Sequence, residues 1–268
     1  MSAPRVWSRT AGVSAWSAGS VGLFETSKVI DGEVFALGRH MRRLGASLAA
    51  LGLEPADDAV LEEGLAAVLD EPLPRGRVRW TVTASADALR SHRGAGGYTY
   101  TVTASEPSPG PSSVGVVLAP WTRNERGASV GLKSTAYAEN VVAMAYAKRQ
   151  GAGEAIIANT RGELCEGTSS NVFVVVDDEI VTPPLESGAL PGVTRELVLQ
   201  WCRADGIPVS EQVLPVSVLD SADEVFLTSA TRDVMAVDRV GERSLSPGPL
   251  TAAAAQSFAR HSAKSRNP

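Results

Sequence analysis

The chain has 268 residues, 44% of them hydrophobic, and carries a formal net charge of −5 at pH 7. Its length and apolar content suit one large folded domain or two modest ones, and they exclude a disordered chain. The negative charge argues against a nucleic-acid surface, and no apolar run is long enough for a membrane span, so we expect neither nucleic acid nor membrane as a partner.

Cys165 and Cys202 are the two cysteines of the sequence, too few for a disulfide framework or a typical zinc site. The three histidines are scattered along the chain, so we expect no metal site. The first ten residues, M-S-A-P-R-V-W-S-R-T, lack the apolar core of a signal peptide. These features predict a reduced, cytoplasmic location.

After residues 1–20, which show little period, the first part of the chain alternates between strand and helix patterns. Period-two alternation and the turn dipeptide Asp31-Gly32 mark strands, whereas apolar residues repeated along one face mark helices. The predicted strands are residues 23–29, 33–37, 77–84 and 98–104, and the predicted helices are residues 40–51 and 55–69.

Residues 106–113 form a linker rich in proline and glycine. Since these residues rarely continue a regular element, we place a domain boundary there. It separates a smaller N-terminal α+β domain, residues 1–110, from a larger C-terminal domain, residues 114–268. Two blocks of mixed strands and helices predict α/β and α+β domains with a ligand-binding cleft between them.

The C-terminal part is again predicted to mix strands and helices. In its first helix we expect Val141, Met144 and Ala145 to face inward. The predicted strands are residues 114–120, 154–159, 171–176, 179–182, 207–213, 224–228 and 234–240; the helices are 137–150, 194–205 and 251–263, with a short helical turn at 216–221.

Lys133 and Glu166 are the first candidates for chemistry. Lys133 sits among small and apolar residues, a setting that favours a neutral, nucleophilic amine over an ordinary surface lysine. Glu166 lies in the small-residue segment C-E-G-T-S-S-N, where it is either a loop acid or a carboxylate set against a ring nitrogen. A lysine and a carboxylate of this kind suit pyridoxal phosphate, whose aldehyde forms a Schiff base with an amine.

Two further segments could bind a phosphate group. L-P-G-V-T-R, residues 190–195, opens a helix, and the free backbone N–H groups of a helix N-terminus bind anions. A small-residue turn at 228–231 could supply more donors. Arg43, on the first predicted helix, could add a charged fork, and Arg42 beside it is the competing candidate.

Taken together, these motifs resemble the class IV aminotransferase family, the pyridoxal-phosphate enzymes of fold type IV. The family includes branched-chain aminotransferases, D-amino acid aminotransferases and 4-amino-4-deoxychorismate lyases. The resemblance extends over residues 23–240. It rests on six segments in the family's order: F-E-T at 24–26, H-M-R-R-L at 40–44, L-K-S-T-A-Y-A-E-N at 132–140, C-E-G-T-S-S-N-V-F at 165–173, L-P-G-V-T-R at 190–195 and D-E-V-F-L-T-S-A at 223–230.

The resemblance implies a two-domain, D-amino acid aminotransferase-like fold, with the cofactor pyridoxal 5'-phosphate bound mainly by the C-terminal domain. Lys133 would carry the cofactor and shuttle the proton, and Glu166 would pair with the pyridine nitrogen. Tyr137 would lie near the phenolic oxygen, and Phe24 would line the substrate pocket. The remaining roles concern the phosphate group, which would be bound by Arg43, Val193, Thr194, Ser229 and Ala230. The resemblance also implies a small-molecule amino substrate and a homodimer with the active site near its interface.

The substrate is less well specified, because the N-terminal domain departs from the family pattern. Ser20-Val21-Gly22 stands where many members have G-D-G, and residues 1–20 lack the usual opening strand. Ala84-Ser85-Ala86 stands where an arginine often binds the substrate carboxylate, so Arg90 or Arg93 would have to replace it.

The short chain and the K-S-x-x-x-x-E spacing of residues 133–139 are closer to the lyases. We therefore expect a 4-amino-4-deoxychorismate lyase-like reaction that releases pyruvate and 4-aminobenzoate for folate synthesis. The alternatives are an amino-acid transaminase of the branched-chain or D-amino acid type and a non-catalytic relative that binds a ligand in the same cleft.

Overall fold

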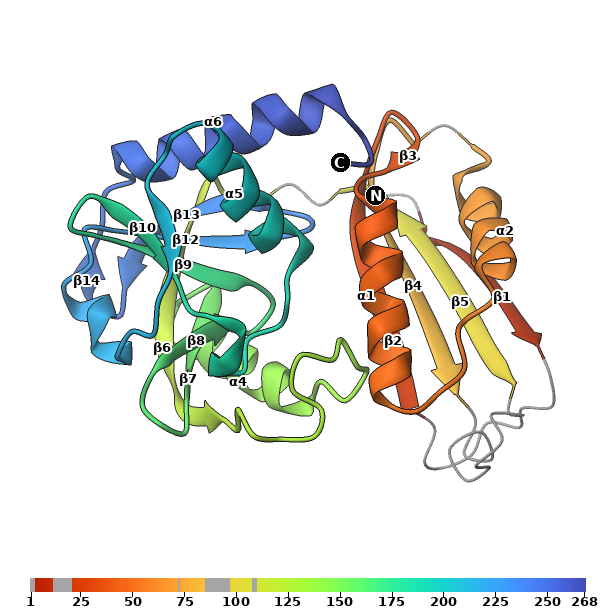
Figure 1. The fold of residues 1–268 in the computed structure, drawn as a ribbon, viewed down its shortest axis with the longest axis horizontal. Coiled ribbons are helices and arrows are strands. Elements are labelled where there is room, and N and C mark those ends of the chain that lie inside the picture. The colour runs from red at the N-terminus through yellow and green to blue at the C-terminus, as the bar shows by residue number, and fades with distance from the viewer. Residues whose placement is uncertain (1–2, 12–20, 72, 85–96, 108–109) are drawn as a thin grey trace. The chain divides into compact units, whose positions relative to one another are not determined.

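The computed structural model describes residues 3–11, 21–71, 73–84, 97–107 and 110–268. The chain forms two compact units (Figure 1). The first comprises Met1–Pro109, Leu132–Ala136 and Arg266–Pro268, and the second comprises Gly110–Gly131 and Tyr137–Ser265.

The first unit is an antiparallel sheet in the order β1-β5-β4-β2-β3, with two helices on one face. Trp80, Tyr100 and Val102 lie on the helix-covered face and are at most 1% exposed. Asp31 and Gly32 both have positive φ and form the predicted turn between β2 and β3. The elements are β1 Arg5–Ala11, β2 Val21–Ile30, β3 Glu33–Val34, α1 Leu37–Ala50, α2 Asp58–Leu69, β4 Arg75–Ala84 and β5 Tyr98–Ser105.

The second unit is a mixed sheet in the order β11-β10-β9-β12-β13-β6-β7-β8, with β14 paired to β13. α5 and α6 pack against each other, with the Trp201 and Phe258 rings 5.0 Å apart. The strands are β6 Ser113–Arg123, β7 Glu154–Asn159, β8 Leu164–Gly167, β9 Asn171–Val176, β10 Glu179–Thr182, β11 Val209–Glu211, β12 Glu224–Ser229, β13 Asp233–Val240 and β14 Arg243–Ser244. The helices are α4 Ala138–Arg149, α5 Val193–Ala204 and α6 Pro249–Lys264, with short 3₁₀ turns at Leu185–Ser187 and Val216–Asp220.

Three sequence expectations differ from the structure. The N-terminal stretch does contain an opening strand, because β1 pairs with β5 along its whole length. Residues 164–167 form strand β8 rather than part of a turn. The inward face of α4 is Asn140, Ala143 and Ala147, whereas Val141 is 63% exposed; the helix packs on β6 and β7 through small side chains, so larger apolar residues point outward.

The division into units also differs from the predicted domain limits: Gly110 belongs to the second unit, and two further segments belong to the first. Leu132–Ala136 belongs to the first unit, since Phe24 N donates to Lys133 O and Thr135 N to Gly22 O. Arg266–Pro268 joins the same unit, where Ala36 N donates to Arg266 O. Among the helices of the described ranges, none is long and apolar enough to cross a membrane.

Candidate functional site

In the first unit, the segment that carries Lys133 lies alongside strand β2. Phe24 N donates to Lys133 O at 2.9 Å, Thr135 N donates to Gly22 O at 2.7 Å, and Leu23 and Ser134 form an antiparallel bridge. A Cβ at Gly22 would lie 2.8 Å from the Thr135 side chain, so a larger residue would push the segment away. The main chain of the lysine is therefore fixed by strand β2, which comes much earlier in the sequence.

Two cationic groups share the ring of Phe24. The Lys133 amine is 4.6 Å from the ring centroid, and the Arg79 guanidinium carbon is 3.7 Å from it. Their separation is therefore at most the sum of these two distances. Phe24 is 5% exposed, and Arg79 is an exposed residue on the face of β4 opposite Trp80. Phe24 was predicted to line the substrate pocket, but Arg79 was missed, although the alternation of R-V-R-W places it on this face.

Arg43 lies in a buried charged cluster on the helix-covered side of β2. Its Nε donates to Glu25 Oε1 at 2.8 Å, and His40 Nδ1 lies 2.7 Å from Glu25 Oε2. Burial by itself raises the pKa of Glu25, but the charge of Arg43 and hydrogen bonds from Arg43 and His40 outweigh it and lower the pKa to about 2. The guanidinium is thus held by an ionised carboxylate.

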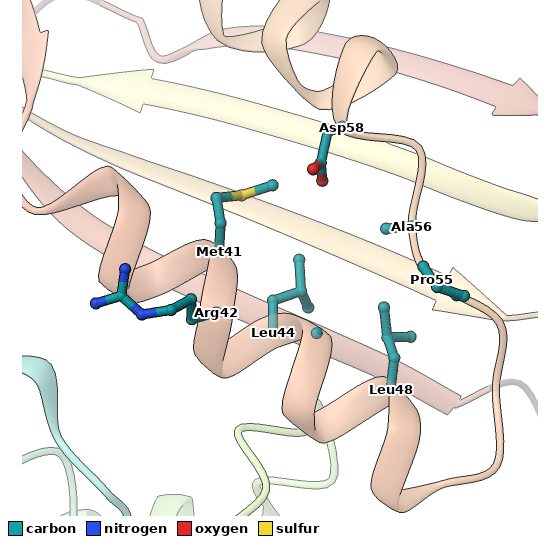
Figure 2. A pocket seen from close by; sticks show the side chains of 8 residues that line it. Met41, Arg42, Leu44, Leu48, Pro55, Ala56 and Asp58 are labelled. Carbon is teal, nitrogen blue, oxygen red and sulfur yellow. The ribbon is translucent and has the colours of Figure 1, made fainter.

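Arg42 has a different environment. It lines a surface cavity with Met41 and Leu48 of α1 and with Pro55 and Asp58, which lie before and at the start of α2 (Figure 2). The two neighbouring arginines therefore differ: Arg43 contacts Glu25 of the sheet, whereas Arg42 borders this cavity with its guanidinium pointing away from it (Figure 2).

In the second unit, Glu166 is a buried carboxylate with a donor on each oxygen. Arg123 Nη2 donates to Oε1 at 3.1 Å, and the backbone N–H of Leu190 donates to Oε2 at 2.8 Å. Arg123 Nη2 also reaches Asn140 Oδ1, at 3.3 Å. The carboxylate is therefore oriented by a cation and by the segment that leads into α5.

The N-terminus of α5 is packed against Asn171 of β9. Asn171 Nδ2 donates to Leu190 O at 2.8 Å, and a methyl group at Gly192 would overlap the Asn171 amide oxygen. The first N–H groups of a helix, here those of Val193 and Thr194, have no carbonyl partner within the helix. Both residues are 5% exposed.

The buried hydroxyl of Thr228 lies on the same face of the sheet as Asn171. Thr228 is paired with Asn171 across β12 and β9, so the two side chains share a face. Thr228 is 1% exposed, and its Oγ1 has no hydrogen-bond partner among the described residues. A phosphate group can satisfy both an unpaired buried hydroxyl and the N–H groups of a helix N-terminus, so these residues fit the phosphate of the predicted cofactor.

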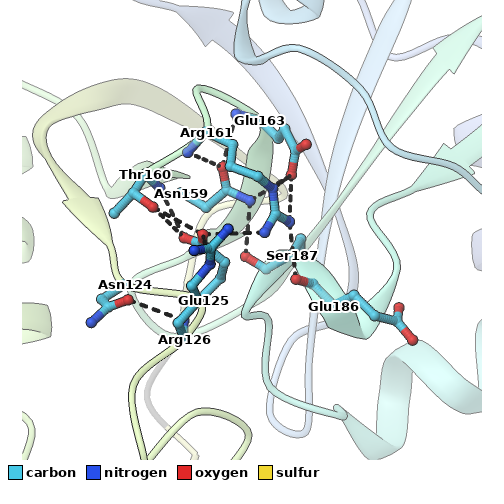
Figure 3. Close-up of polar contacts among 9 residues, drawn as sticks. All are labelled: Asn124, Glu125, Arg126, Asn159, Thr160, Arg161, Glu163, Glu186 and Ser187. Atoms are coloured by element: carbon cyan, nitrogen blue, oxygen red, sulfur yellow. Dashed lines mark hydrogen bonds and ion pairs between the residues drawn. The ribbon is translucent and has the colours of Figure 1, made fainter.

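The loop that precedes Lys133 is anchored by Glu125 (Figure 3). The Glu125 side chain is 1% exposed and accepts hydrogen bonds from Thr160 Oγ1, at 2.7 Å, and from Thr160 N, at 3.1 Å. Arg161 Nη1 lies 3.1 Å from the same carboxylate. Gly188 has φ +96°, and a Cβ there would lie 3.0 Å from Glu125 Cα, so glycine is needed beside the loop.

The predicted site residues are thus distributed over both units. Lys133, Phe24 and Arg43 belong to the first unit. The second unit contains a larger set: Tyr137, Glu166, Val193, Thr194, Ser229 and Ala230. The Tyr137 carbonyl accepts the N–H of Val141 at the start of α4. The candidate substrate residues Arg90 and Arg93 lie outside the described residues.

Comparison with known proteins identifies the family. The class IV amino-transferase family matches residues 22–240. D-alanine aminotransferase of Bacillus licheniformis is 31% identical over 243 residues, which cover 86% of this chain and 83% of that protein. A Thermotoga maritima protein inferred to be a branched-chain-amino-acid aminotransferase is 42% identical over 108 residues, which cover 39% of this chain and 40% of that protein. This chain therefore spans less than half the length of that second relative.

A solved structure from Legionella pneumophila, of a protein proposed to be a 4-amino-4-deoxychorismate lyase, has the same fold. It superposes with a TM-score of 0.81 at 24% identity and covers 90% of each chain. The chain belongs to the class IV aminotransferase family and has that family's fold, fold type IV of the pyridoxal-phosphate enzymes. Family members are pyridoxal-phosphate-dependent transaminases or lyases that bind amino-acid substrates and are commonly dimeric.

Proposed function

We propose that Lys133 is the catalytic residue and that Glu166 and the start of α5 bind the cofactor. The observation that carries this proposal is the fixed position of Lys133, whose main chain is hydrogen-bonded to β2 and whose amine lies over the Phe24 ring. When bound, pyridoxal phosphate stores the electron pair that remains after the substrate's α-carbon loses a proton. The Lys133 amine takes that proton and returns it.

The other residues bind and orient. Arg123 and the Leu190 N–H keep the Glu166 carboxylate in position. When the cofactor is bound, this carboxylate would accept a hydrogen bond from the protonated ring nitrogen and stabilise the proton there. Tyr137 would lie near the phenolic oxygen of the cofactor. The phosphate-binding set comprises Arg43, Val193, Thr194, Thr228, Ser229 and Ala230.

We also propose that the substrate carries a carboxylate bound by Arg79. Its support is the exposed guanidinium that shares the Phe24 ring with the lysine amine. Arg79→Gln should raise KM about 10- to 100-fold for a carboxylate-bearing amine, because a charge-assisted hydrogen bond is lost. KM for an amine without a carboxylate should change little. Arg77→Gln, an exposed arginine on the same face of β4, is the matched control. Equal effects of both variants would contradict the assignment.

For the reaction itself, we propose the 4-amino-4-deoxychorismate lyase type, supported by the spacing of residues 133–139. The second candidate is an amino-acid transaminase, favoured by the match to D-alanine aminotransferase along most of the chain. The residues assigned above serve either reaction, since both begin with removal of the α-proton.

A direct assay separates the two reactions. Protein loaded with pyridoxal phosphate is incubated with aminodeoxychorismate, and separately with L- and D-amino acids plus 2-oxoglutarate or pyruvate. Release of 4-aminobenzoate supports the lyase. Formation of glutamate or alanine without 4-aminobenzoate establishes the transaminase instead. Lys133→Ala should abolish either activity and the visible absorption band of the bound cofactor, whereas Lys148→Ala, an exposed lysine of α4, should leave both unchanged. A band that survives in Lys133→Ala would refute the role of Lys133.

We further propose a cytoplasmic homodimer. The free, buried thiols of Cys165 and Cys202 support a reducing compartment. Exposed apolar side chains of the second unit, Trp121, Val141 and Val142, support a subunit interface that covers them. Light scattering after size exclusion should give twice the chain mass of 28.0 kDa. A monomer that is active at every concentration would contradict the dimer.

A further inference from the structure

Arg232 joins three segments of the second unit. Its Nη2 donates to Glu154 Oε2 at 2.6 Å and to Ser169 Oγ at 3.1 Å, and its Nε donates to Ser229 Oγ at 3.2 Å. Glu154 begins β7, Ser169 lies between β8 and β9, and Ser229 ends β12. We call these four residues the Arg232 clip.

The carboxylate at the centre of the clip is fully buried. Glu154 is 0% exposed, and it also accepts hydrogen bonds from Thr168 Oγ1 and, at 2.9 Å each, from the N–H and Oγ of Ser169. Among the described residues, Arg232 is the cation paired with the Glu154 carboxylate. A buried carboxylate that loses its cation keeps an uncompensated negative charge.

The clip is built into the turn where the phosphate is proposed to bind. Arg232 N donates to Ser229 O at 3.3 Å, and the next residue, Asp233, has φ +54°. Ala230, Thr231 and Arg232 therefore form a tight connection between β12 and β13, ended by a left-handed residue. The side chain and the main chain of Arg232 both hold Ser229, which follows the unpartnered Thr228 directly.

We propose that Arg232 is a positioning residue for the cofactor phosphate: it holds the 228–231 turn in its binding conformation and neutralises Glu154 beneath it. This inference rests on the proposed phosphate-binding role of that turn. It assigns Arg232 no contact with the reacting atoms. Its effect should therefore depend on whether the ligand carries a phosphate.

The test compares two ligands that differ only in the phosphate. Dissociation constants of pyridoxal phosphate and pyridoxal are measured on cofactor-free full-length protein by absorption and fluorescence titration. Arg232→Met should weaken pyridoxal phosphate binding about tenfold or more, because an unpaired carboxylate then repels a nearby phosphate. Pyridoxal binding should change less than about threefold. Inorganic phosphate should also raise the melting temperature less in Arg232→Met than in the wild type.

Three further variants separate the causes. Arg239→Met removes another arginine that bonds to backbone carbonyls, at Gly151 and Gly241, and should leave the ratio of the two dissociation constants unchanged. Arg232→Lys keeps the charge but cannot make all three contacts, so it should restore the ratio only in part. Glu154→Gln in the Arg232→Met background removes the unpaired charge and should recover much of the pyridoxal phosphate affinity.

The outcomes also separate this inference from the proposed function. If Arg232→Met weakens both ligands equally, its role is structural and the inference is wrong. If neither ligand is affected while the wild type binds pyridoxal phosphate through Lys133, the inference is wrong and the proposed function stands. If the wild type binds no pyridoxal phosphate, both are wrong.

Discussion

Gly192, the residue before α5, allows a sharp test of how the phosphate-binding end of that helix is held. Its φ of −67° and ψ of 131° are allowed for any residue, so Gly192→Ala introduces no backbone strain. The new methyl group would instead overlap the amide oxygen of Asn171. Asn171 is 5% exposed and donates to Leu190 O at 2.8 Å, so it cannot move without breaking this bond.

Two contributions set the expected cost. Breaking the Asn171–Leu190 hydrogen bond and leaving a buried amide unpaired costs about 1–3 kcal/mol. Replacing glycine by alanine at a helix N-cap costs about 0.5–1 kcal/mol more, because alanine is a poorer cap. Gly192→Ala should therefore lower the free energy of unfolding by about 1.5–4 kcal/mol.

Urea unfolding at equilibrium measures this cost in two backgrounds. In Asn171→Ala the amide oxygen is absent, so Gly192→Ala should then cost only the cap contribution, about 0.5–1 kcal/mol. Pyridoxal phosphate affinity, measured in parallel, should fall for Gly192→Ala alone because the start of α5 is displaced. An equal cost in both backgrounds would show that Asn171 does not limit the space at residue 192, and the steric argument would fail.

Three shorter predictions test other parts of the structure. Burial, together with nearby acidic charge, raises the pKa of Cys165 to about 12 and that of Cys202 to about 11, so a thiol reagent at pH 8 should label neither in the native protein and both after denaturation. Burial lowers the pKa of His40 below its ordinary value of 6.5, despite its bond to Glu25, so protons bind preferentially to the unfolded chain and stability should fall from pH 7 to pH 5; His40→Gln should flatten this dependence. Asp57→Ala removes a cap that accepts the N–H groups at the start of α2 and should cost about 1 kcal/mol in urea unfolding; no change would show that this cap is not stabilising.

Local patterns predicted most elements, because the information lies within each segment. The strands over Arg75–Ala84 and Tyr98–Ser105 and the turn at Asp31-Gly32 follow from alternation and from turn chemistry. Strand β1 was missed because it is stabilised by pairing with β5, which lies far away in the sequence. In this pair Arg5 is opposite Ala104. The predicted inward face of α4 was wrong because alanines, rather than the larger apolar residues, fit against the sheet.

The order of short motifs along the chain was enough to predict the family and its cofactor. The candidate lysine, the candidate acid and the candidate phosphate-binding helix start each lie within one such motif. Other features depend on the tertiary structure, because they join residues that are far apart in sequence. The Phe24 ring contacts both Arg79 and Lys133, and buried Glu154 is paired with Arg232, 78 positions away in the sequence. Charge compensation and packing determine such contacts, and no local pattern in the sequence encodes them.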